Sequence, residues 1–482
     1  MDLRNQKLAT AINALERRAE RQDSDLTLYN TYVDGGVLAE LSDTQSQVIY
    51  GRRGVGKTHL LHFHRHRNSL QANRSPYFIF DCQRLGSGTA TMSNDPSVVG
   101  RNYAFELLNE LGTRLFGYIE TLKLKKSKEE AAQNAALEFV SRIYSEDRSF
   151  DCRNLSSIFR ALCSNAEIER VFIALDEFVS VPQSAQPIFA HVLKQIFASD
   201  RRVVFKIAGV TFQTNLYAER DGQRVGMEIG ADVFSDIDLD SYFLWDEDRD
   251  GVMTFFSQVL YNHLGEILGW PLTRSAVDKR NHIISFFFTQ ERCLQELVRA
   301  SEGNCRDLLN ILRLAYSEFR RGSGARIGID HVSTAARTWY RDAKLANLSQ
   351  GTRDEEFLNF LIQDVIKNKK SRSFMVSYQD AGHPMLVRLL NLRLLHRMRT
   401  TWSHPDRPGE PYHIFTIDYG CYADLKGTRS EPRQEVFFFA KELESERFSS
   451  IESQEVVPLP DRRSIRRIVL SRDQVDRFYV RA

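Results

Sequence analysis

The sequence predicts an α/β protein, with a parallel sheet covered by helices on both faces, followed by an all-helical domain and a C-terminal domain of helices and strands. Three observations support this fold class. A glycine-rich stretch at residues 51–58 lies between a short strand-like run and a helix-like pattern. Apolar strand-like runs then alternate with helical periodicity up to residue 245, which is typical of parallel strands joined by crossover helices. From residue 246 to residue 348 the pattern is almost entirely helical.

The glycine-rich stretch reads G-x-x-x-x-G-K-T, the pattern of a phosphate-binding loop. Its glycines allow the backbone to fold tightly, so that consecutive N–H groups point at one anion. Lys57 is expected to reach the outer phosphates of ATP, and the Thr58 hydroxyl is expected to ligate Mg²⁺. The helix that begins here would direct its positive N-terminal end at the phosphates. The predicted nucleotide-binding residues are Gly51, Gly54, Val55, Gly56, Lys57 and Thr58.

A second motif consists of an apolar run, residues 171–175, that ends in the adjacent carboxylates Asp176 and Glu177. A fully buried parallel strand has this appearance, and ligands bind at the carboxyl ends of such strands. Asp176 is therefore expected to hold Mg²⁺, directly or through water, and Glu177 to polarise the attacking water as a general base. Many strands end in a charge, so the motif gains its weight from the phosphate loop upstream.

The next strand-like run, residues 202–210, ends at Thr211. A polar side chain at this position would lie between the phosphate loop and the acidic pair. Thr211 is therefore a candidate for orienting water.

The two ends of the chain carry further helical patterns. Residues 1–28 include a charged, amphipathic segment, which we expect to be an extra helix packed on the first domain; a docking helix is the alternative. Residues 349–482 contain two helical patterns followed by a strand, a Pro/Gly turn and a second strand, the order of a winged helix-turn-helix. The second helix is expected at residues 384–398. Its arginines are candidates for contacts with a DNA backbone, with a solvated charged face as the equal alternative: Arg388, Arg393, Arg397 and Arg399.

Composition excludes several classes of protein. The 482 residues carry 65 basic and 63 acidic side chains, a net charge of +2, so any nucleic-acid surface must be a local patch. The 6 cysteines are scattered without a C-x-x-C pair, which argues against a zinc site or a disulfide framework. No apolar run approaches membrane-spanning length, and the N-terminus lacks a signal-peptide core. We expect a cytoplasmic protein.

These motifs resemble those of AAA+ P-loop ATPases and, among them, the branch of origin-recognition and replication-initiator proteins. The resemblance rests on the phosphate loop, the acidic strand, Thr211, and residues 303–308 (Gly-Asn-Cys-Arg-Asp-Leu), which are similar to the G-N-x-R-x-L element of that branch's helical lid. It covers roughly residues 30–345 and, more weakly, the C-terminal domain. It implies a sensor-1 role for Thr211 and a sensor-2 role for Arg306, whose side chain would reach the γ-phosphate of ATP.

The resemblance also implies a homo- or hetero-oligomer in which an arginine acts on the neighbouring subunit's nucleotide. The sequence does not identify this arginine. Arg201 and Arg202 fit its usual place only loosely, and Arg220 and Arg224 compete with them.

Motifs and resemblance together predict an ATPase core at residues 29–245, a helical lid at 246–348 and a winged-helix-like domain at 349–482. The expected function is an ATP- and Mg²⁺-dependent switch that hydrolyses ATP and binds DNA through its C-terminal domain, in replication, a mobile element or defence. The alternative is a nucleotide-controlled oligomeric scaffold that recruits a protein partner, with slow or incidental hydrolysis. The intact pair of Asp176 and Glu177 favours hydrolysis.

Overall fold

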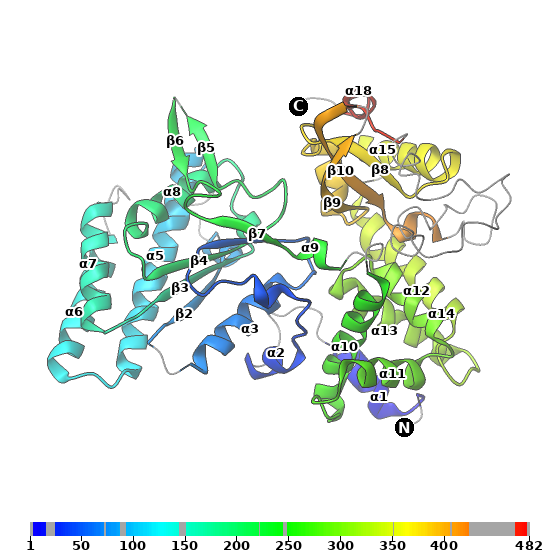
Figure 1. The fold of residues 1–482 in the computed structure, drawn as a ribbon, viewed down its shortest axis with the longest axis horizontal. Helices are drawn as coiled ribbons and strands as arrows, with labels where there is room; N and C mark the ends of the chain where they lie inside the picture. Colours follow the sequence, from blue (N-terminus) through cyan, green and yellow to red (C-terminus); the bar gives the residue numbers. More distant parts are fainter. Residues whose placement is uncertain are drawn as a thin grey trace. The chain divides into compact units, whose positions relative to one another are not determined.

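The computed structural model describes residues 3–15, 25–71, 74–86, 93–143, 151–220, 222–243, 248–349, 351–404, 407–423 and 468–479 of the chain. These residues belong to two compact units (Figure 1). No helix in the described ranges combines the length and the hydrophobicity needed to cross a membrane. Unit 1 comprises Met1–Arg18, Arg53–Val55 and Asp240–Ala482, and unit 2 comprises Ala19–Arg52 and Gly56–Leu239.

The described part of unit 2 contains a five-stranded sheet in the order β2-β3-β4-β1-β7, and every neighbouring pair is parallel. The predicted parallel α/β architecture is therefore confirmed. Because the strands run in one direction, their carboxyl ends lie at one edge of the sheet, where ligands bind in open α/β folds. The strands are β1 (Gln47–Tyr50), β2 (Tyr77–Asp81), β3 (Val171–Asp176), β4 (Val203–Gly209) and β7 (Phe234–Asp238).

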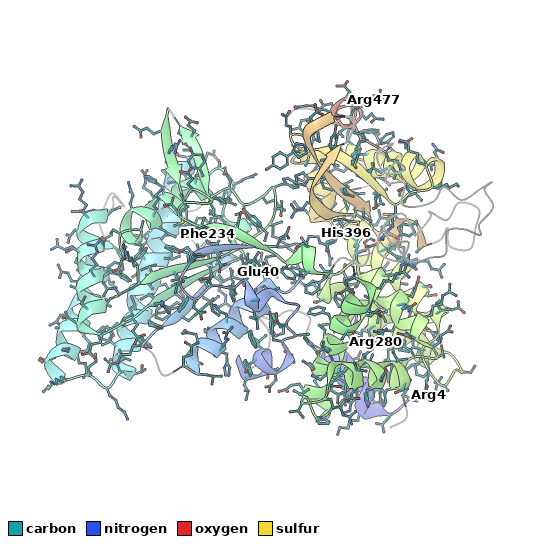
Figure 2. All side chains as sticks on the ribbon, viewed as in Figure 1. Arg4, Glu40, Phe234, Arg280, His396 and Arg477 are labelled. Carbon is teal, nitrogen blue, oxygen red and sulfur yellow. The ribbon has the colours of Figure 1, made fainter. Side chains whose placement is uncertain are left out.

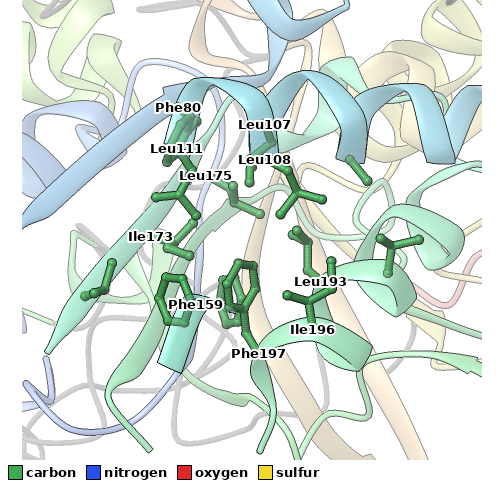
Figure 3. Packing of buried hydrophobic residues seen from close by; sticks show 14 of the residues in the cluster. Phe80, Leu107, Leu108, Leu111, Phe159, Ile173, Leu175, Leu193, Ile196 and Phe197 are labelled. Atoms are coloured by element: carbon green, nitrogen blue, oxygen red, sulfur yellow. The ribbon is translucent and has the colours of Figure 1, made fainter. Parts of the chain in front are cut away.

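Helices cover both faces of this sheet, and the alternation of side chains along β3 shows how. Phe172 points to the face that packs on α3, where it stacks on Tyr77 and meets His64 edge to face. Ile173 and Leu175 point to the opposite face and join the large core formed with α5, α7 and α8 (Figure 3). The covering helices are α3 (Lys57–Ser69), α5 (Pro96–Thr121), α7 (Cys152–Asn165) and α8 (Gln186–Phe197), and α6 (Lys126–Ile143) packs on α5 and α7.

The structure differs from expectation at three places in unit 2. A hairpin of β5 (Tyr217–Arg220) and β6 (Gln223–Gly226) follows β4 and was not anticipated from sequence. The sequence of residues 237–243 is typical of a strand, but β7 ends at Asp238 and α9 (Leu239–Tyr242) begins there. The sequence makes Asn154 a plausible cap for a helix at residues 154–166, but α7 is capped by Asp151, whose side chain accepts from the Asn154 N–H at 3.0 Å.

Unit 1 contains the helical region, and the N-terminal helix α1 (Gln6–Ala14) packs on its helix α10. The hydroxyl of Tyr316 donates to the Leu3 carbonyl at 2.6 Å, and Arg4 (labelled in Figure 2) donates to the Gly322 carbonyl at 2.6 Å. The expectation that this helix packs on the first domain is therefore wrong. The helices of the region are α10 (Arg249–Leu268), α11 (Ala276–Phe287), α12 (Glu291–Ser301), α13 (Cys305–Arg321) and α14 (Ile329–Trp339), and the π-helical η5 (Tyr340–Lys344) follows.

The described C-terminal part of unit 1 has the order helix, strand, helix and hairpin, and its assignment as a winged helix stays a prediction. Its described strands form an antiparallel sheet in the order β8-β10-β9. A short segment near the end of the chain covers β8: Met375 N donates to the Ile468 carbonyl and Leu470 N to the Met375 carbonyl, both at 2.8 Å. The elements are α15 (Arg353–Leu361), the π-helical η7 (Ile362–Asn368), β8 (Ser373–Ser377), α16 (Pro384–Asn391), β9 (Leu395–His404), β10 (Arg407–Ile417) and, near the end of the chain, α18 (Arg472–Asp476).

The helix expected at residues 384–398 is wrong beyond Asn391. Arg393 adopts a left-handed conformation with φ of 59°, which ends the helix and leads into β9. Arg397 therefore lies in a strand, where it is only 8% exposed. Arg399 also lies in β9, but its side chain, like the basic residues at 461–467, lies outside the described residues.

A buried lysine in β4 fixes the segment that leads into the phosphate loop. Lys206 is fully buried, and its ammonium donates to the Ser42 carbonyl, the Gln45 carbonyl and Gln47 Oε1 at 2.5, 2.9 and 2.5 Å. A buried ammonium is tolerated only when its donors are satisfied. These three acceptors therefore hold residues 42–47 against β4 and set the start of β1.

We expect Lys206→Met to lower the thermal transition of unit 2 by about 5–10 °C, because the Ser42 and Gln45 carbonyls would lose the donation from Lys206, at a cost of about 2–4 kcal/mol. Differential scanning calorimetry of the full chain measures this. The matched control is Lys194→Met, since Lys194 pairs with Asp232 and its side chain is 36% exposed; a surface pair contributes less than about 1 kcal/mol. Equal shifts in the two variants would contradict the anchoring role of Lys206.

Candidate functional site

The predicted phosphate loop connects β1 to α3, as its pattern requires. Gly54 and Gly56 adopt left-handed backbone conformations, with φ of 90° and 116°. A Cβ placed on Gly56 would meet no atom within 4 Å, so the backbone angle, and not crowding, requires glycine here. The space beside Gly56 leaves the first turn of α3 approachable by an anion.

The ammonium of Lys57 lies over the loop. It donates to the carbonyls of Gly51 at 2.6 Å and Arg52 at 3.0 Å. The loop's own carbonyl oxygens thus hold the lysine charge against the loop.

The structure brings the two predicted metal ligands together. Asp176 at the end of β3 is 5% exposed, and it accepts hydrogen bonds from the Thr58 hydroxyl and from the Glu177 N–H, the latter at 2.9 Å. Burial raises the pKa of Asp176 to about 6, against the opposing effect of these hydrogen bonds and of Lys57. A buried carboxylate beside a hydroxyl is an all-oxygen donor set of the kind that Mg²⁺ prefers. The residues therefore fit a magnesium–nucleotide complex.

Glu177 and Thr211 lie at the same edge of the sheet. Glu177 has a left-handed backbone with φ of 48° and begins the short helix η4 (Phe178–Ser180), so the chain turns sharply directly after Asp176. Thr211 follows β4 by two residues, and the strand order places β4 between β1 and β3. The topology thus sets Thr211 between the loop strand and the acidic strand. Phe212, the next residue, is also left-handed at φ of 65°, and strained conformations of this kind concentrate at functional sites.

Arg306, the expected sensor 2, belongs to unit 1 and lies in the first turn of α13. The tip of the phosphate loop, Arg53–Val55, belongs to the same unit. The backbone N–H of Arg306 donates to the Gly54 carbonyl at 3.2 Å. The lid motif is therefore in direct contact with the loop tip through its backbone.

Asn304 is a residue whose contact with the loop was missed in the sequence. It caps α13, is 1% exposed, and donates from Nδ2 to the Arg53 carbonyl at 2.8 Å. The motif G-N-x-R places an asparagine at a helix start, and its N-cap role was readable there. Its reach to the loop, 251 residues away in the chain, was not.

The candidates for a trans-acting arginine lie at two different ends of unit 2. Arg201 and Arg202 precede β4, at the amino edge of the sheet, and Arg202 forms an ion pair with Asp200 at 2.7 Å. Arg220 and Arg224 lie on the β5–β6 hairpin, and Arg224 is exposed.

The arginines that are candidates for DNA contact do not share one helix, because α16 ends at Asn391. Arg388 on α16 pairs with Asp354 at 2.8 Å, Arg393 pairs with Asp307, and Arg397 is buried. These side chains serve internal contacts because the predicted helix ends before two of them.

No protein-family model matches this sequence, and no curated protein matches it. Solved structures do show similarity. The Aeropyrum pernix ORC1 protein in complex with DNA is 12% identical, with a TM-score of 0.32 over 86% of this chain and 94% of that chain. The Drosophila ORC bound to DNA is 13% identical, with a TM-score of 0.30 over 85% of this chain and 92% of that chain.

Proposed function

We propose that this chain binds Mg·ATP at the phosphate loop and hydrolyses it, and that it works as a nucleotide-driven switch. The observation that supports this most strongly is the hydrogen bond from Thr58 to the buried Asp176 carboxylate. It joins the two motifs that the chemistry needs, although they lie far apart in the sequence. Burying a partly ionised carboxylate destabilises the fold. Its presence at the end of β3 therefore favours a functional role such as cation binding.

In this proposal the loop binds the phosphates and Lys57 moves from the carbonyls of Gly51 and Arg52 to the outer phosphate oxygens. Thr58 and Asp176 would hold Mg²⁺, which supplies positive charge to the β- and γ-phosphates when bound. Glu177 accepts a proton from the attacking water while the water oxygen bonds to the γ-phosphorus. The bond between the γ-phosphorus and the oxygen that bridges to the β-phosphate breaks in the same step. Thr211 orients that water, and Arg306 stabilises charge on the γ-phosphate.

The structure supports the nucleotide of the proposed switch more directly than it supports the macromolecular partner. We propose DNA as the partner, as the sequence suggested, although not through the arginine face first expected. The internal pairing of Arg388 and Arg393 favours the second candidate, a nucleotide-controlled oligomeric scaffold that recruits a protein.

Two variants separate binding from turnover. Lys57→Ala should abolish ATP binding, whereas Glu177→Gln should keep binding and lower turnover by about 10²–10⁴-fold, because only the proton acceptor is lost. Titration calorimetry with ATP and a phosphate-release assay measure the two properties. Glu169→Gln, at the amino end of the same strand and exposed, is the control and should behave as wild type. Normal hydrolysis by Glu177→Gln would place the base elsewhere, and tight binding by Lys57→Ala would remove the site assignment.

The raised pKa of Asp176 predicts how the ligand-free protein responds to pH. The folded-state pKa of about 6 exceeds the ordinary 3.8, so the unfolded chain binds fewer protons and stability falls as pH rises from 4 to 6. At pH 7.5 the ionised Asp176 costs about 3 kcal/mol, from 1.36 kcal/mol per pKa unit. Asp176→Asn should therefore raise the calorimetric transition of the ligand-free protein at pH 7.5.

The same variant should leave the transition nearly unchanged at pH 4, where Asp176 is protonated in the folded protein. Added Mg²⁺ and ATP should stabilise the wild type and not the variant, since only the wild type offers a charged ligand. A lower transition for Asp176→Asn at pH 7.5 would show that the carboxylate is not strained by burial.

A DNA titration of the full chain distinguishes the two partners. For a DNA-binding switch, affinity for duplex DNA should be higher with ATP than without it and should fall steeply between 50 and 200 mM salt, as counterions are released, by about tenfold or more. Lys57→Ala should lose the dependence on ATP. Binding that is absent, or unaffected by ATP, would favour the scaffold, and light scattering would then show whether ATP changes the assembly.

A further inference from the structure

The first turn of α13 clamps the tip of the phosphate loop through two backbone carbonyls. Asn304 Nδ2 donates to the Arg53 carbonyl at 2.8 Å, and Arg306 N donates to the Gly54 carbonyl at 3.2 Å. The approach is close: a Cβ on Gly54 would lie 2.7 Å from Asn304 Oδ1 and 2.9 Å from Arg306 Cβ. All of these residues belong to unit 1. The first turn of α13 therefore holds the loop tip by its carbonyls.

The same helical turn is anchored to the C-terminal part of unit 1 by buried charged side chains. Asp307 is fully buried, and its N–H donates to Asn304 Oδ1 at 3.2 Å. Its carboxylate forms ion pairs with Arg393 and, at 3.0 Å, with Lys344 at the end of the π-helical η5. Asn304 and Asp307 thus hold each other, one facing the loop and the other facing the C-terminal part of unit 1.

The chain of charges continues into the C-terminal sheet. Lys344 is 1% exposed and pairs also with Asp418, at 2.5 Å, directly after β10. Asp418 pairs with His396 of β9 at 2.8 Å, and His396 is labelled in Figure 2. Burial opposes the charge of Lys344, but Asp307 and Asp418 outweigh it and raise its pKa. Burial likewise opposes the charge of Asp418, but Lys344 and His396 outweigh it and lower the pKa.

A buried network of this kind moves as a unit. Displacing one member leaves another charge buried without a partner, which is strongly unfavourable. A shift of the loop tip would therefore shift the first turn of α13 together with its charges, because the alternative is a broken ion pair. A small change at one end of the network then switches the network between discrete arrangements, and it is not absorbed gradually along the network.

We propose that the first turn of α13 is a latch in which Asn304 is a positioning residue for the phosphate loop and the Asp307–Lys344–Asp418 chain passes the state of the loop to β9 and β10. The inference rests on the proposed nucleotide binding. Lys57 holds the adjacent part of the same loop through the carbonyls of Gly51 and Arg52. In this proposal nucleotide binding moves the loop tip and breaks the two latch hydrogen bonds, so the latch opposes binding.

The sharpest variant is Asn304→Ser. Serine caps a helix about as well as asparagine, so α13 keeps its start, but the shorter side chain cannot reach the Arg53 carbonyl. Asp307→Asn is the second variant, since it keeps the shape of the side chain and removes the charge that Lys344 and Arg393 share. Asn310→Ser is the matched control: Asn310 lies on the same helix, is 4% exposed, and donates to the Arg306 carbonyl at 2.8 Å.

Hydrogen exchange of the full chain, read by mass spectrometry with and without Mg·ATP, tests the proposal in a Glu177→Gln background that prevents turnover. In the parent protein, which carries only Glu177→Gln, ATP should change hydrogen exchange in peptides covering residues 51–58 and in peptides covering residues 395–417. In Asn304→Ser and Asp307→Asn the first change should remain and the second should be lost. Asn304→Ser should also bind ATP about three- to tenfold more tightly, which is the worth of one ordinary hydrogen bond. The Asn310→Ser control should keep both exchange changes.

The outcomes separate the two proposals. If ATP changes neither region in the parent protein and no binding is detected, the nucleotide function fails. If ATP changes the loop, and residues 395–417 respond equally in the parent and in both variants, the latch is overturned while the nucleotide site stands. Unchanged or weaker ATP binding by a folded Asn304→Ser would also overturn it, because the clamp would then not oppose the nucleotide.

Discussion

Asp176 is buried at the end of β3 and accepts hydrogen bonds from the Thr58 hydroxyl and the Glu177 N–H, and these bonds together with the charge of Lys57 offset the cost of its burial only in part. The sheet creates this situation, because a fully buried strand must end where neighbouring strands end. Neutral donors compensate a carboxylate only in part, so its pKa is raised. Three features surround the Asp176 carboxylate: Thr58 donates to it, Glu177 turns the chain sharply after it, and the strand order places β4 between β1 and β3 beside it.

In unit 1 the buried charged groups have oppositely charged partners. Its buried charges are matched one against another, with Lys344 between Asp307 and Asp418. A matched network keeps its members together, whereas an under-compensated carboxylate is ready to accept a cation. The chain therefore places a responsive group at the end of β3 and a matched polar network behind α13.

Much of the fold was predictable because its signals are local. The glycine-rich loop, the apolar run ending in Asp176, and the helical periodicity after residue 245 each depend on neighbours in sequence. The pairing of Thr58 with Asp176 followed from topology, since parallel strands share an edge. What failed depended on tertiary context. The left-handed turn at Arg393 converts an amphipathic pattern into a strand, and no local signal shows that Asp307 and Asp354 lie where they neutralise the predicted DNA contacts. The clamp by Asn304 depends on a contact across 251 residues.

The pairing of Ile468–Leu470 with Met375 gives the last described stretch of the chain a protective task. Strand β8 is the border of its sheet, and an uncovered border with an apolar sequence is a template for adding strands from other molecules. Met375 and its neighbours Phe374 and Val376 are fully buried. A shortened form of the protein that ends before residue 468 would expose this border, and its colloidal behaviour would change before its nucleotide chemistry did. Affinity tags or fluorescent labels are thus better attached at a site that leaves this pairing undisturbed.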